Sequence, residues 1–256
     1  MFSYPRHGVA AGKAPDGAWT ASFTVERQAG NEGLSLEYAA KFCMEQGRAL
    51  CTETQWQRAC LDDPKLGQLK TWTLTLEGKQ AVVRGGAAGC PAREVVAPTE
   101  TQLDRVAVCC DRAIAITTTN DNESFLASSA KRLLDYEQAA RRSSASKLRD
   151  LLASEVVYGG KERQLDQVVS AFEKAKDSEW TVLDTCDVSI DKDGSESRLV
   201  SDCRVIYHNA GAFSSDTLRL VHGGPDSKIQ LIGKKEHMSL LGGEKKERVR
   251  SFLGGD

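Results

Sequence analysis

The chain has 256 residues, of which 40% are hydrophobic and 27% are charged, and its formal net charge is −2. This composition is typical of a soluble globular protein, and the length favours two domains of ordinary size. Opposite charges balance in both halves, so the basic field that nucleic acid or an anionic membrane would need is missing. No apolar run approaches the ~18 residues of a membrane span, and residues 1–20 lack the basic start and apolar stretch of a signal peptide.

The strongest local pattern predicts two short helices around a tight bend. Apolar residues recur at helical spacing through residues 34–46, and Gly47 follows where a left-handed C-terminal cap is favoured. A second helix begins at Thr52, because Gln55 three residues later completes a capping-box pattern. Trp56 then lies on the apolar face of this helix and is expected in the core.

Short strands are expected around these helices. Alternating apolar and polar residues, glycines and prolines mark their limits. The expected elements are a strand near 19–27, strands at 70–76 and 80–84, a loop over 86–102 and a closing strand over 103–116.

A polar link at residues 117–122 is the predicted domain boundary. Beyond it, helical periodicity comes first and alternating strands follow. The expected helices cover about 123–143, 146–153 and 164–177, a brief strand covers 156–158, and four strands cover 180–190, 198–208, 213–222 and 228–238. Helices followed by an antiparallel meander predict an α+β layer pair.

The eight cysteines favour disulfides over a metal site. Six lie in the first part of the chain and two in the second: Cys43, Cys51, Cys60, Cys90, Cys109 and Cys110, then Cys186 and Cys203. No C-x-x-C pair or Cys/His set at metal spacing occurs, so no metal is expected. We therefore expect an extracytoplasmic protein, in the periplasm or at the cell surface, whose signal or anchor was removed or lies outside these residues.

Some disulfide pairings can be argued from geometry. Cys51 and Cys60 lie about 13 Å apart on a helix of 1.5 Å rise, beyond the ~7 Å reach of a disulfide, so they need other partners. In the second part, closing a hairpin near residues 192–194 places Cys186 opposite Cys203 and predicts a cross-strand disulfide.

The first part of the chain resembles a known family. The run Ala40-Lys-Phe-Cys, followed by Gly47-Arg-Ala-Leu-Cys-Thr-Glu-Thr-Gln-Trp, is similar to the "G-x-R-L-x-T-E-x-E-W" core of the sulfatase-modifying-factor family, the formylglycine-generating enzymes and their non-catalytic relatives. Trp72-Thr73 and the Val82–Gly86 turn follow in the family's order, and the match covers roughly 30–112. The resemblance implies a C-type-lectin-like fold, with Cys43 paired to Cys109 or Cys110 and Cys90 paired within the same set.

The second part resembles another family, chiefly in the order of its elements. The Val156–Lys161 stretch, the helix after it and Trp180 look like the "Y-x-G-K…helix…W" portion of the cone-shaped proteins related to ketosteroid isomerase, scytalone dehydratase and nuclear transport factor two. The resemblance covers about 122–240. The predicted architecture is therefore a disulfide-stapled C-type-lectin-like domain followed by an α+β cone of three helices on a curved antiparallel sheet.

These resemblances assign four segments. They are a lectin-like domain at 1–116, a linker at 117–122, a cone domain at 123–241 and a C-terminal tail at 242–256.

Catalytic copper chemistry is not expected in the first domain. The resemblance implies two cysteines five positions apart as copper ligands, and Cys90 matches the second of them. Gly85 stands at the first position, and a single thiolate does not make the two-sulfur site that Cu(I) prefers. The domain is therefore interpreted as a non-catalytic relative without a cofactor.

The cone family includes enzymes with a pocket Asp as general base. Asp184, on an apolar strand face, is the one candidate here, with Tyr158, Tyr207 and His208 as candidate neighbours. The alternative is that Asp184 lies at the sheet edge or pairs with Arg204 or Arg219.

The leading hypothesis is a bacterial extracytoplasmic protein that binds a protein or glycan partner without catalysis, without inserting into the membrane and without binding nucleic acid. The rival hypothesis is a small-molecule isomerase or dehydratase acting at Asp184. Because recognition in lectin-like domains often lies in a late loop, residues 87–102 are the candidate binding region. The candidate binding residues are Arg93, Glu94, Thr99 and Gln102.

Overall fold

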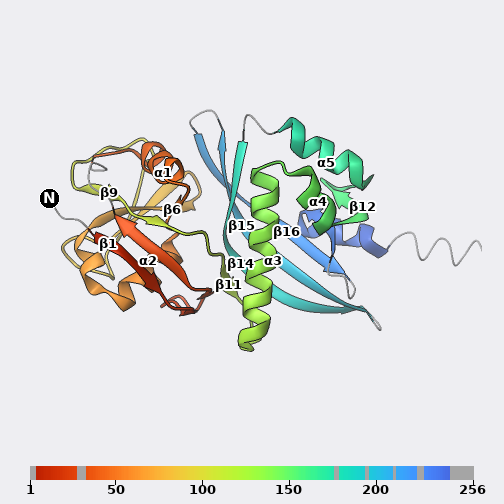
Figure 1. The fold of residues 1–256 in the computed structure, drawn as a ribbon, viewed down its shortest axis with the longest axis horizontal. Coiled ribbons are helices and arrows are strands. Elements are labelled where there is room, and N and C mark those ends of the chain that lie inside the picture. Colours follow the sequence, from red (N-terminus) through yellow and green to blue (C-terminus); the bar gives the residue numbers. More distant parts are fainter. Residues whose placement is uncertain are drawn as a thin grey trace, which may run out of the picture.

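The computed structural model describes residues 4–27, 33–175, 179–193, 196–209, 212–223 and 228–242. It forms two lobes side by side, with the N-terminal half of the chain in one and most of the C-terminal half in the other (Figure 1). Helices and mostly antiparallel sheets occur in both lobes, which confirms the predicted α+β class.

Two small sheets build the N-terminal lobe within the described residues. Their strand orders are β1-β4-β10-β5 and β8-β7-β6-β9. The strands of the first sheet are β1 (Tyr4–Val9), β4 (Phe23–Arg27), β10 (Cys109–Cys110) and β5 (Ala49–Leu50). Those of the second are β8 (Arg93–Val96), β7 (Gln80–Arg84), β6 (Lys70–Glu77) and β9 (Arg105–Ala107).

Helices α1 (Leu36–Glu45) and α2 (Glu53–Asp62) and the short helix η1 (Pro64–Gln68) pack on these sheets. Gly47 has a φ of 72°, and Thr52 and Gln55 form a reciprocal capping box, so both predicted helix limits are confirmed. Trp56 is fully buried, as expected.

All eight cysteines lie in described segments and all form disulfides. The pairs are Cys43–Cys109, Cys51–Cys110, Cys60–Cys90 and Cys186–Cys203. The prediction that Cys51 and Cys60 do not pair with each other is confirmed. The predicted cross-strand disulfide in the second lobe is confirmed as well. Three of the four bonds lie in the N-terminal lobe. They join Cys43 of α1, Cys51 just before α2 and Cys60 of α2 to residues 30 to 66 positions away.

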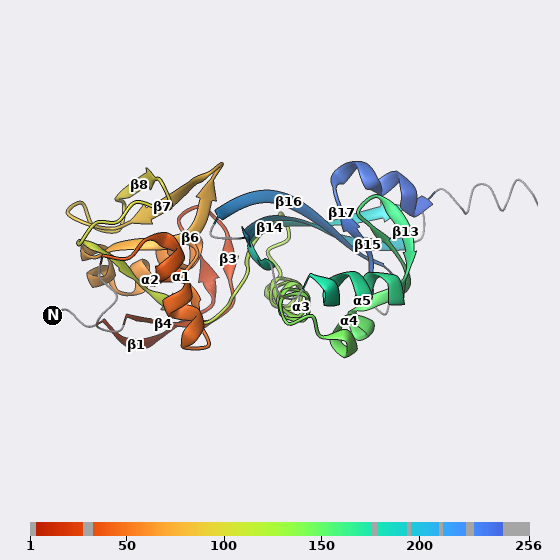
Figure 2. The same cartoon turned by 90° about the horizontal axis from the view of Figure 1, so that it is seen from above.

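The second lobe is a curved sheet with three helices on one face (Figure 2). Within the described residues the sheet has nine strands, in the order β13-β12-β17-β16-β15-β14-β11-β3-β2. Its C-terminal strands are β12 (Leu152–Tyr158), β13 (Lys161–Gln164), β14 (Glu179–Asp193), β15 (Glu196–Asn209), β16 (Ala212–Gly223) and β17 (Lys228–Gly233). The covering helices are α3 (Glu123–Arg141), α4 (Ala145–Leu151) and α5 (Leu165–Lys174).

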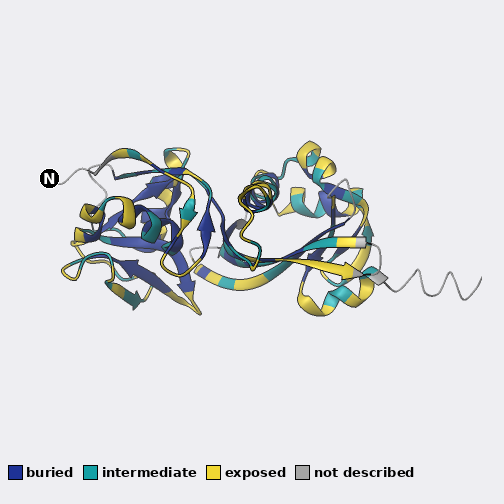
Figure 3. Ribbon diagram, turned by 90° about the horizontal axis from the view of Figure 1, so that it is seen from below, coloured by how far each residue is buried: buried dark blue, intermediate teal, exposed yellow. Residues whose placement is uncertain are grey.

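The two lobes share a sheet and part of a core. Strands β2 (Gly12–Lys13), β3 (Trp19–Thr20) and β11 (Ala115–Thr117) come from the N-terminal part, and β11 pairs parallel with β14. Val182, Ile206 and Phe213 of the C-terminal part pack in one apolar cluster with α1 and β6. Figure 3 shows buried segments in both lobes and in the strands where the lobes meet.

The closing strand expected at 103–116 is wrong as a single element. The chain passes through three sheets there, as β9, β10 and β11 in turn. The strand expected near 19–27 is also divided in two. Strand β3 pairs with β11, whereas β4 pairs with β1 and β10.

Other predicted boundaries also change. The expected loop at 86–102 contains β8, whose β-branched Val95 and Val96 pair with β7. The last expected strand, 228–238, ends at Gly233. The short helix η2 (Lys235–Gly242) follows, in which Met238 and Leu241 pack at helical spacing on the outer face of the sheet. The predicted tail at 242–256 lies outside the described residues from 243 onward.

No helix in the described segments combines the length and apolar character required to cross a lipid bilayer.

Candidate ligand-binding site

A cavity of about 160 Å³ lies in the second lobe between the helices and the sheet. Aromatic side chains from four elements form its walls. They are Tyr136 of α3, Tyr158 of β12, Phe172 of α5 and Tyr207 of β15. Arg141 and Ser143, from the end of α3, lie at the same cavity. The lining therefore combines ring faces with hydroxyl groups and one guanidinium group.

Ring contacts set the shape of this cavity. The centroids of Tyr136 and Phe172 lie 6.5 Å apart with an interplanar angle of 85°. Tyr158 meets Phe172 at 5.7 Å and 51°. Edge-to-face pairs of this kind hold rings more firmly than area burial alone. The walls are thus formed before any ligand arrives.

The end of α3 is fixed by its own backbone. Ser143 adopts a left-handed φ of 45°, and its hydroxyl donates to the Phe172 carbonyl at 2.9 Å. This contact ties the end of α3 to α5 and keeps Arg141 at the cavity.

Protonation at the cavity follows from burial. Burial raises the pKa of the Tyr136 phenol, so this group stays neutral at physiological pH and can donate a hydrogen bond. Burial also lowers the pKa of Arg141. The charge of Glu137, whose Oε1 lies 3.6 Å from Arg141 Nη1, raises that pKa and partly offsets the effect of burial. Because arginine remains protonated in proteins, the cavity presents a positive charge beside neutral hydroxyl groups.

Asp184 does not line this cavity. It lies where the lobes meet, fully buried, with Arg204 Nη2 at 2.6 Å from its Oδ2 and with the Thr75 hydroxyl of β6 donating to the same oxygen at 3.2 Å. Burial raises the pKa of Asp184, and Arg204 partly offsets that shift. The alternative of pairing with Arg204 is therefore what the structure shows.

The two other residues proposed for catalysis have different outcomes. Tyr207 lines the cavity. His208 belongs to β15, and its side chain lies outside the described residues. The sequence-based candidates Asp184 and Tyr207 are thus not brought together in one pocket.

The candidate binding loop of the first lobe forms internal ion pairs. Arg93 is exposed, yet its guanidinium pairs with Glu53 at 2.7 Å and also with Glu77. Glu94 is half-buried and accepts from Lys70 at 3.1 Å. Both charges therefore stabilise the lobe itself.

Thr99 and Gln102 are exposed, and the Gln102 amide donates to Glu100 at 2.7 Å. Next to them, Leu103 is 89% exposed. The end of the loop, from Thr99 to Leu103, is therefore the part of the candidate binding region where exposed side chains gather.

The copper position suggested by the first resemblance is closed. The Cys90 sulfur is bonded to Cys60 and so offers no thiolate. Among the residues that the structure describes, no group of three or more His, Cys, Asp or Glu side chains is placed to hold a metal ion.

Sequence reasoning missed the residues that form most of the cavity. Tyr136, Arg141 and Phe172 were treated only as parts of helices. A usable signal was present, because Tyr136 interrupts the aliphatic stripe of its helix and a basic pair, Arg141-Arg142, follows in the last turn. Only the fold places them opposite Tyr158 and Tyr207.

No protein-family model matches the sequence, and no curated protein matches it.

Several solved structures are similar to part of the chain. A protein named "Rd1NTF2_04 with long sheet" has 18% identity and a TM-score of 0.31, over 41% of this chain and 96% of that chain. An LEH-like epoxide hydrolase of M. tuberculosis has 14% identity and a TM-score of 0.32, over 47% and 94%. A candidate ketosteroid isomerase of Shewanella frigidimarina has 13% identity and a TM-score of 0.33, over 45% and 97%. Likenesses this weak carry no conclusion about activity, ligand or partner.

Proposed function

We propose that this chain is an extracytoplasmic binding protein of the periplasm or cell surface, without catalytic activity. The cone cavity holds a small ligand, and the C-type-lectin-like lobe contacts a protein or glycan partner through the 87–102 loop. The four disulfides support an oxidising compartment.

One observation supports the ligand-binding role above others. The cavity lining consists of phenol, phenyl and aliphatic groups with Arg141 and Ser143, and no carboxylate or imidazole is among the described lining residues. A cavity of about 160 Å³ is of the size that holds one benzene-sized molecule. Ring faces, hydroxyl groups and a guanidinium suit a single-ring ligand with oxygen substituents.

The rival function, an isomerase or dehydratase using Asp184, has less support. A general base must come within hydrogen-bond reach of the proton that it removes. The carboxylate of Asp184 is instead enclosed between Arg204 and Thr75, at the contact of the lobes.

The test is equilibrium binding of single-ring probes, namely phenol, benzoate and a monosaccharide, to the full chain by ligand-observed NMR. Ala140→Leu places three more carbon atoms into the cavity, whereas Ala127→Leu makes the same change on the exposed face of α3. We expect at least one probe to bind the wild type and Ala127→Leu but to lose about tenfold in affinity for Ala140→Leu, since overpacking there costs about 1–3 kcal/mol. Equal binding by both variants would refute the cavity as the site.

The loop proposal has its own test. Leu103→Ser combined with Gln102→Ala changes only exposed side chains. A glycan-array signal or a purified partner bound by the wild type should be lost in this variant while the thermal midpoint is unchanged; retention of binding would assign recognition to another surface.

A further inference from the structure

A second hollow lies between the lobes, outside the cone cavity. It has a volume of about 470 Å³ and is formed by the end of α1, the chain between β10 and β11, and the end of α3. Four arginines and one aspartate are among its lining residues: Arg48, Arg112, Arg141, Arg142 and Asp111. We refer to it as the arginine cleft.

Asp111 is already neutralised within the protein. Arg48 Nε lies 3.2 Å from its Oδ1, and the Thr24 hydroxyl donates to its Oδ2. Arg48 also forms an ion pair with Glu26, with its Nη1 at 2.9 Å from Glu26 Oε2. This side of the cleft is thus an internal network with little charge left to offer.

The opposite side carries excess positive charge. Arg112 and Arg141 share one carboxylate, Glu137, which is fully buried and does not reach solvent. Arg142 is exposed and forms no ion pair within the described part of the chain. Three cations therefore stand against one anion.

Arg112 has one nitrogen left over. Its side chain is 8% exposed, and Nε and Nη2 bind the two oxygens of Glu137 at 2.9 and 2.5 Å. Nη2 also donates to the Leu183 carbonyl at 2.6 Å. Nη1, on the other edge of the planar group, is buried and finds no acceptor among the described residues. An unpaired buried donor is costly, and an anion in the cleft would remove that cost.

Capping of helix ends does not account for these arginines. At the end of α3 the backbone N–H groups of Arg142, Ser143 and Ser144 already donate to the last carbonyls. At the end of α1 the N–H groups of Gln46, Gly47 and Arg48 do the same. The arginine side chains are therefore not needed as caps.

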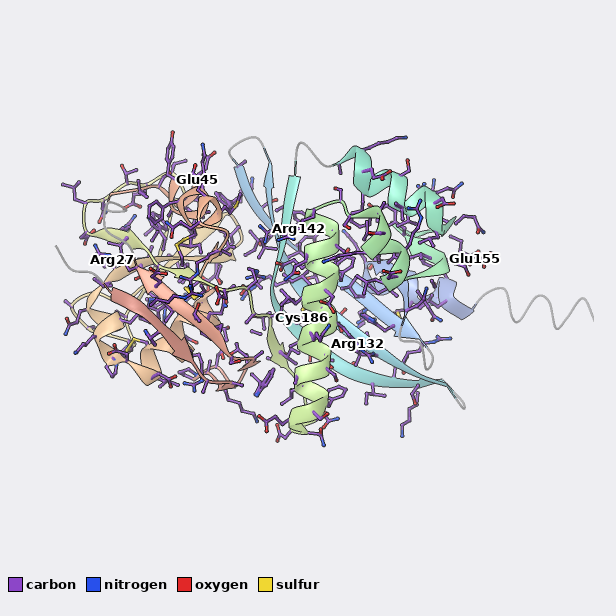
Figure 4. All side chains as sticks on the ribbon, in the orientation of Figure 1. Arg27, Glu45, Arg132, Arg142, Glu155 and Cys186 are labelled. Carbon is purple, nitrogen blue, oxygen red and sulfur yellow. A yellow bond between two sulfur atoms is a disulfide. The ribbon has the colours of Figure 1, made fainter. Side chains whose placement is uncertain are left out.

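We propose that the arginine cleft binds an oxyanion, the carboxylate or phosphate group of a small molecule, through Arg112 Nη1, Arg142 and the Gln138 amide. Arginine forks match both groups in geometry. Figure 4 labels Arg142 at the upper end of α3. Gln138 and Arg142 lie at the end of α3, and Arg112 lies on the chain that joins the two lobes, so the bound anion contacts both segments.

The experiment uses the full chain at constant ionic strength, with inorganic phosphate and citrate as separate probes and chloride as the reference anion. Amide NMR spectra of the wild type identify the site. We expect saturable shifts at Gly47, Gln138 and Arg142, and the stronger of the two probes indicates whether phosphate or carboxylate is preferred. Shifts confined to other residues, or no saturation with either probe, would overturn the proposal.

Two variants of equal charge change complete the test. Arg142→Gln alters the cleft, and Arg132→Gln alters the middle of the same helix, well away from it (Figure 4). We expect roughly tenfold weaker binding for Arg142→Gln, the loss of one charge-assisted hydrogen bond, and unchanged affinity for Arg132→Gln. If both variants bound the anion as well as the wild type, or lost affinity equally, Arg142 would not be part of a specific anion site and the proposal would be contradicted. Because Arg142 is exposed, the variant is expected to fold, which its thermal midpoint checks.

Discussion

The two lobes hold their folds in different ways. The N-terminal lobe has strands of two to eight residues in two small sheets, and three disulfides tie the α1–α2 region to strand β10 and to the loop at Cys90. The C-terminal lobe has strands of up to 15 residues in one continuous sheet and a single disulfide. Short strands bury little surface each, so covalent links contribute more of the specificity in the first lobe, whereas hydrogen-bond register does so in the second.

The joint between the lobes resembles neither of them. Two buried carboxylates meet arginines there, Asp184 with Arg204 and Glu137 with Arg112. An apolar cluster with residues from both lobes lies beside them. Four changes sharpen this comparison, beginning with the largest expected effect.

The largest effect is expected from two neighbouring disulfides of the first lobe. Cys43–Cys109 and Cys51–Cys110 span 66 and 59 residues, and either bond alone closes nearly the same loop. Removing one therefore opens only a loop of roughly nine residues and should cost about 2–3 kcal/mol, while removing both should cost about 7 kcal/mol. The measurement is urea unfolding of the two paired Cys→Ala variants and the fourfold variant. The shared-loop account would be contradicted if the variant without all four cysteines lost only as much unfolding free energy as the two single-disulfide variants added together.

Glu137→Gln should have the next largest effect. It removes the charge that two arginines share at the joint, and unpaired charge left in a buried site costs about 3–5 kcal/mol. Glu173→Gln, on the exposed side of α5, is the matched control and should change the free energy of unfolding by less than about 0.5 kcal/mol. Similar losses in both variants would show that the buried carboxylate contributes no more than a surface one.

The single disulfide of the second lobe should matter less. Cys186 and Cys203 are 17 residues apart and already opposite each other in a long ladder. Their replacement by alanine should cost about 3 kcal/mol and leave one cooperative transition. Hydrogen exchange should show β14 and β15 still protected; loss of their protection would mean that this lobe, too, depends on its cross-link.

Asp184→Asn should have the smallest effect, on the order of 1 kcal/mol, because Arg204 is 40% exposed and can be hydrated once its partner is neutral. The sign of this change in unfolding free energy depends on pH. The pKa of Asp184 is raised by folding, so the folded protein keeps this proton to higher pH than the unfolded chain, and ionisation lowers wild-type stability as pH rises above 3.8. The difference in unfolding free energy between the variant and the wild type should therefore shift in favour of the variant as the pH is raised from 4 to 7, measured by urea unfolding. A relative loss over that range would show that the ion pair outweighs burial.

Much of this fold follows from the sequence. Gly47, the Thr52–Gln55 box and the apolar stripes predict α1, α2, α3 and α5 close to their observed limits, because those signals are local. The facing of Cys186 and Cys203 follows from hairpin register.

The site was less predictable. Strands β9 to β11 go to three sheets, and no local pattern encodes that choice of partners. Tyr136 and Tyr207 are 71 positions apart and meet only through the stacking of α3 on the sheet. Asp184 was the candidate base, yet its side chain lies where the lobes meet, between Thr75 of β6 and Arg204 of β15.

Cross-linking in an oxidising compartment is the central claim, and peptide mapping of the non-reduced, alkylated protein tests it most directly. The prediction is three cross-linked species with no alkylated thiol. In one, the peptide that carries both Cys109 and Cys110 is linked to the Cys43 peptide and to the Cys51 peptide, and the other two are the Cys60–Cys90 and Cys186–Cys203 pairs. Protein exported to the periplasm should give this pattern without added oxidant. Alkylation of most cysteines in that material would contradict the account and reopen a thiol-based function.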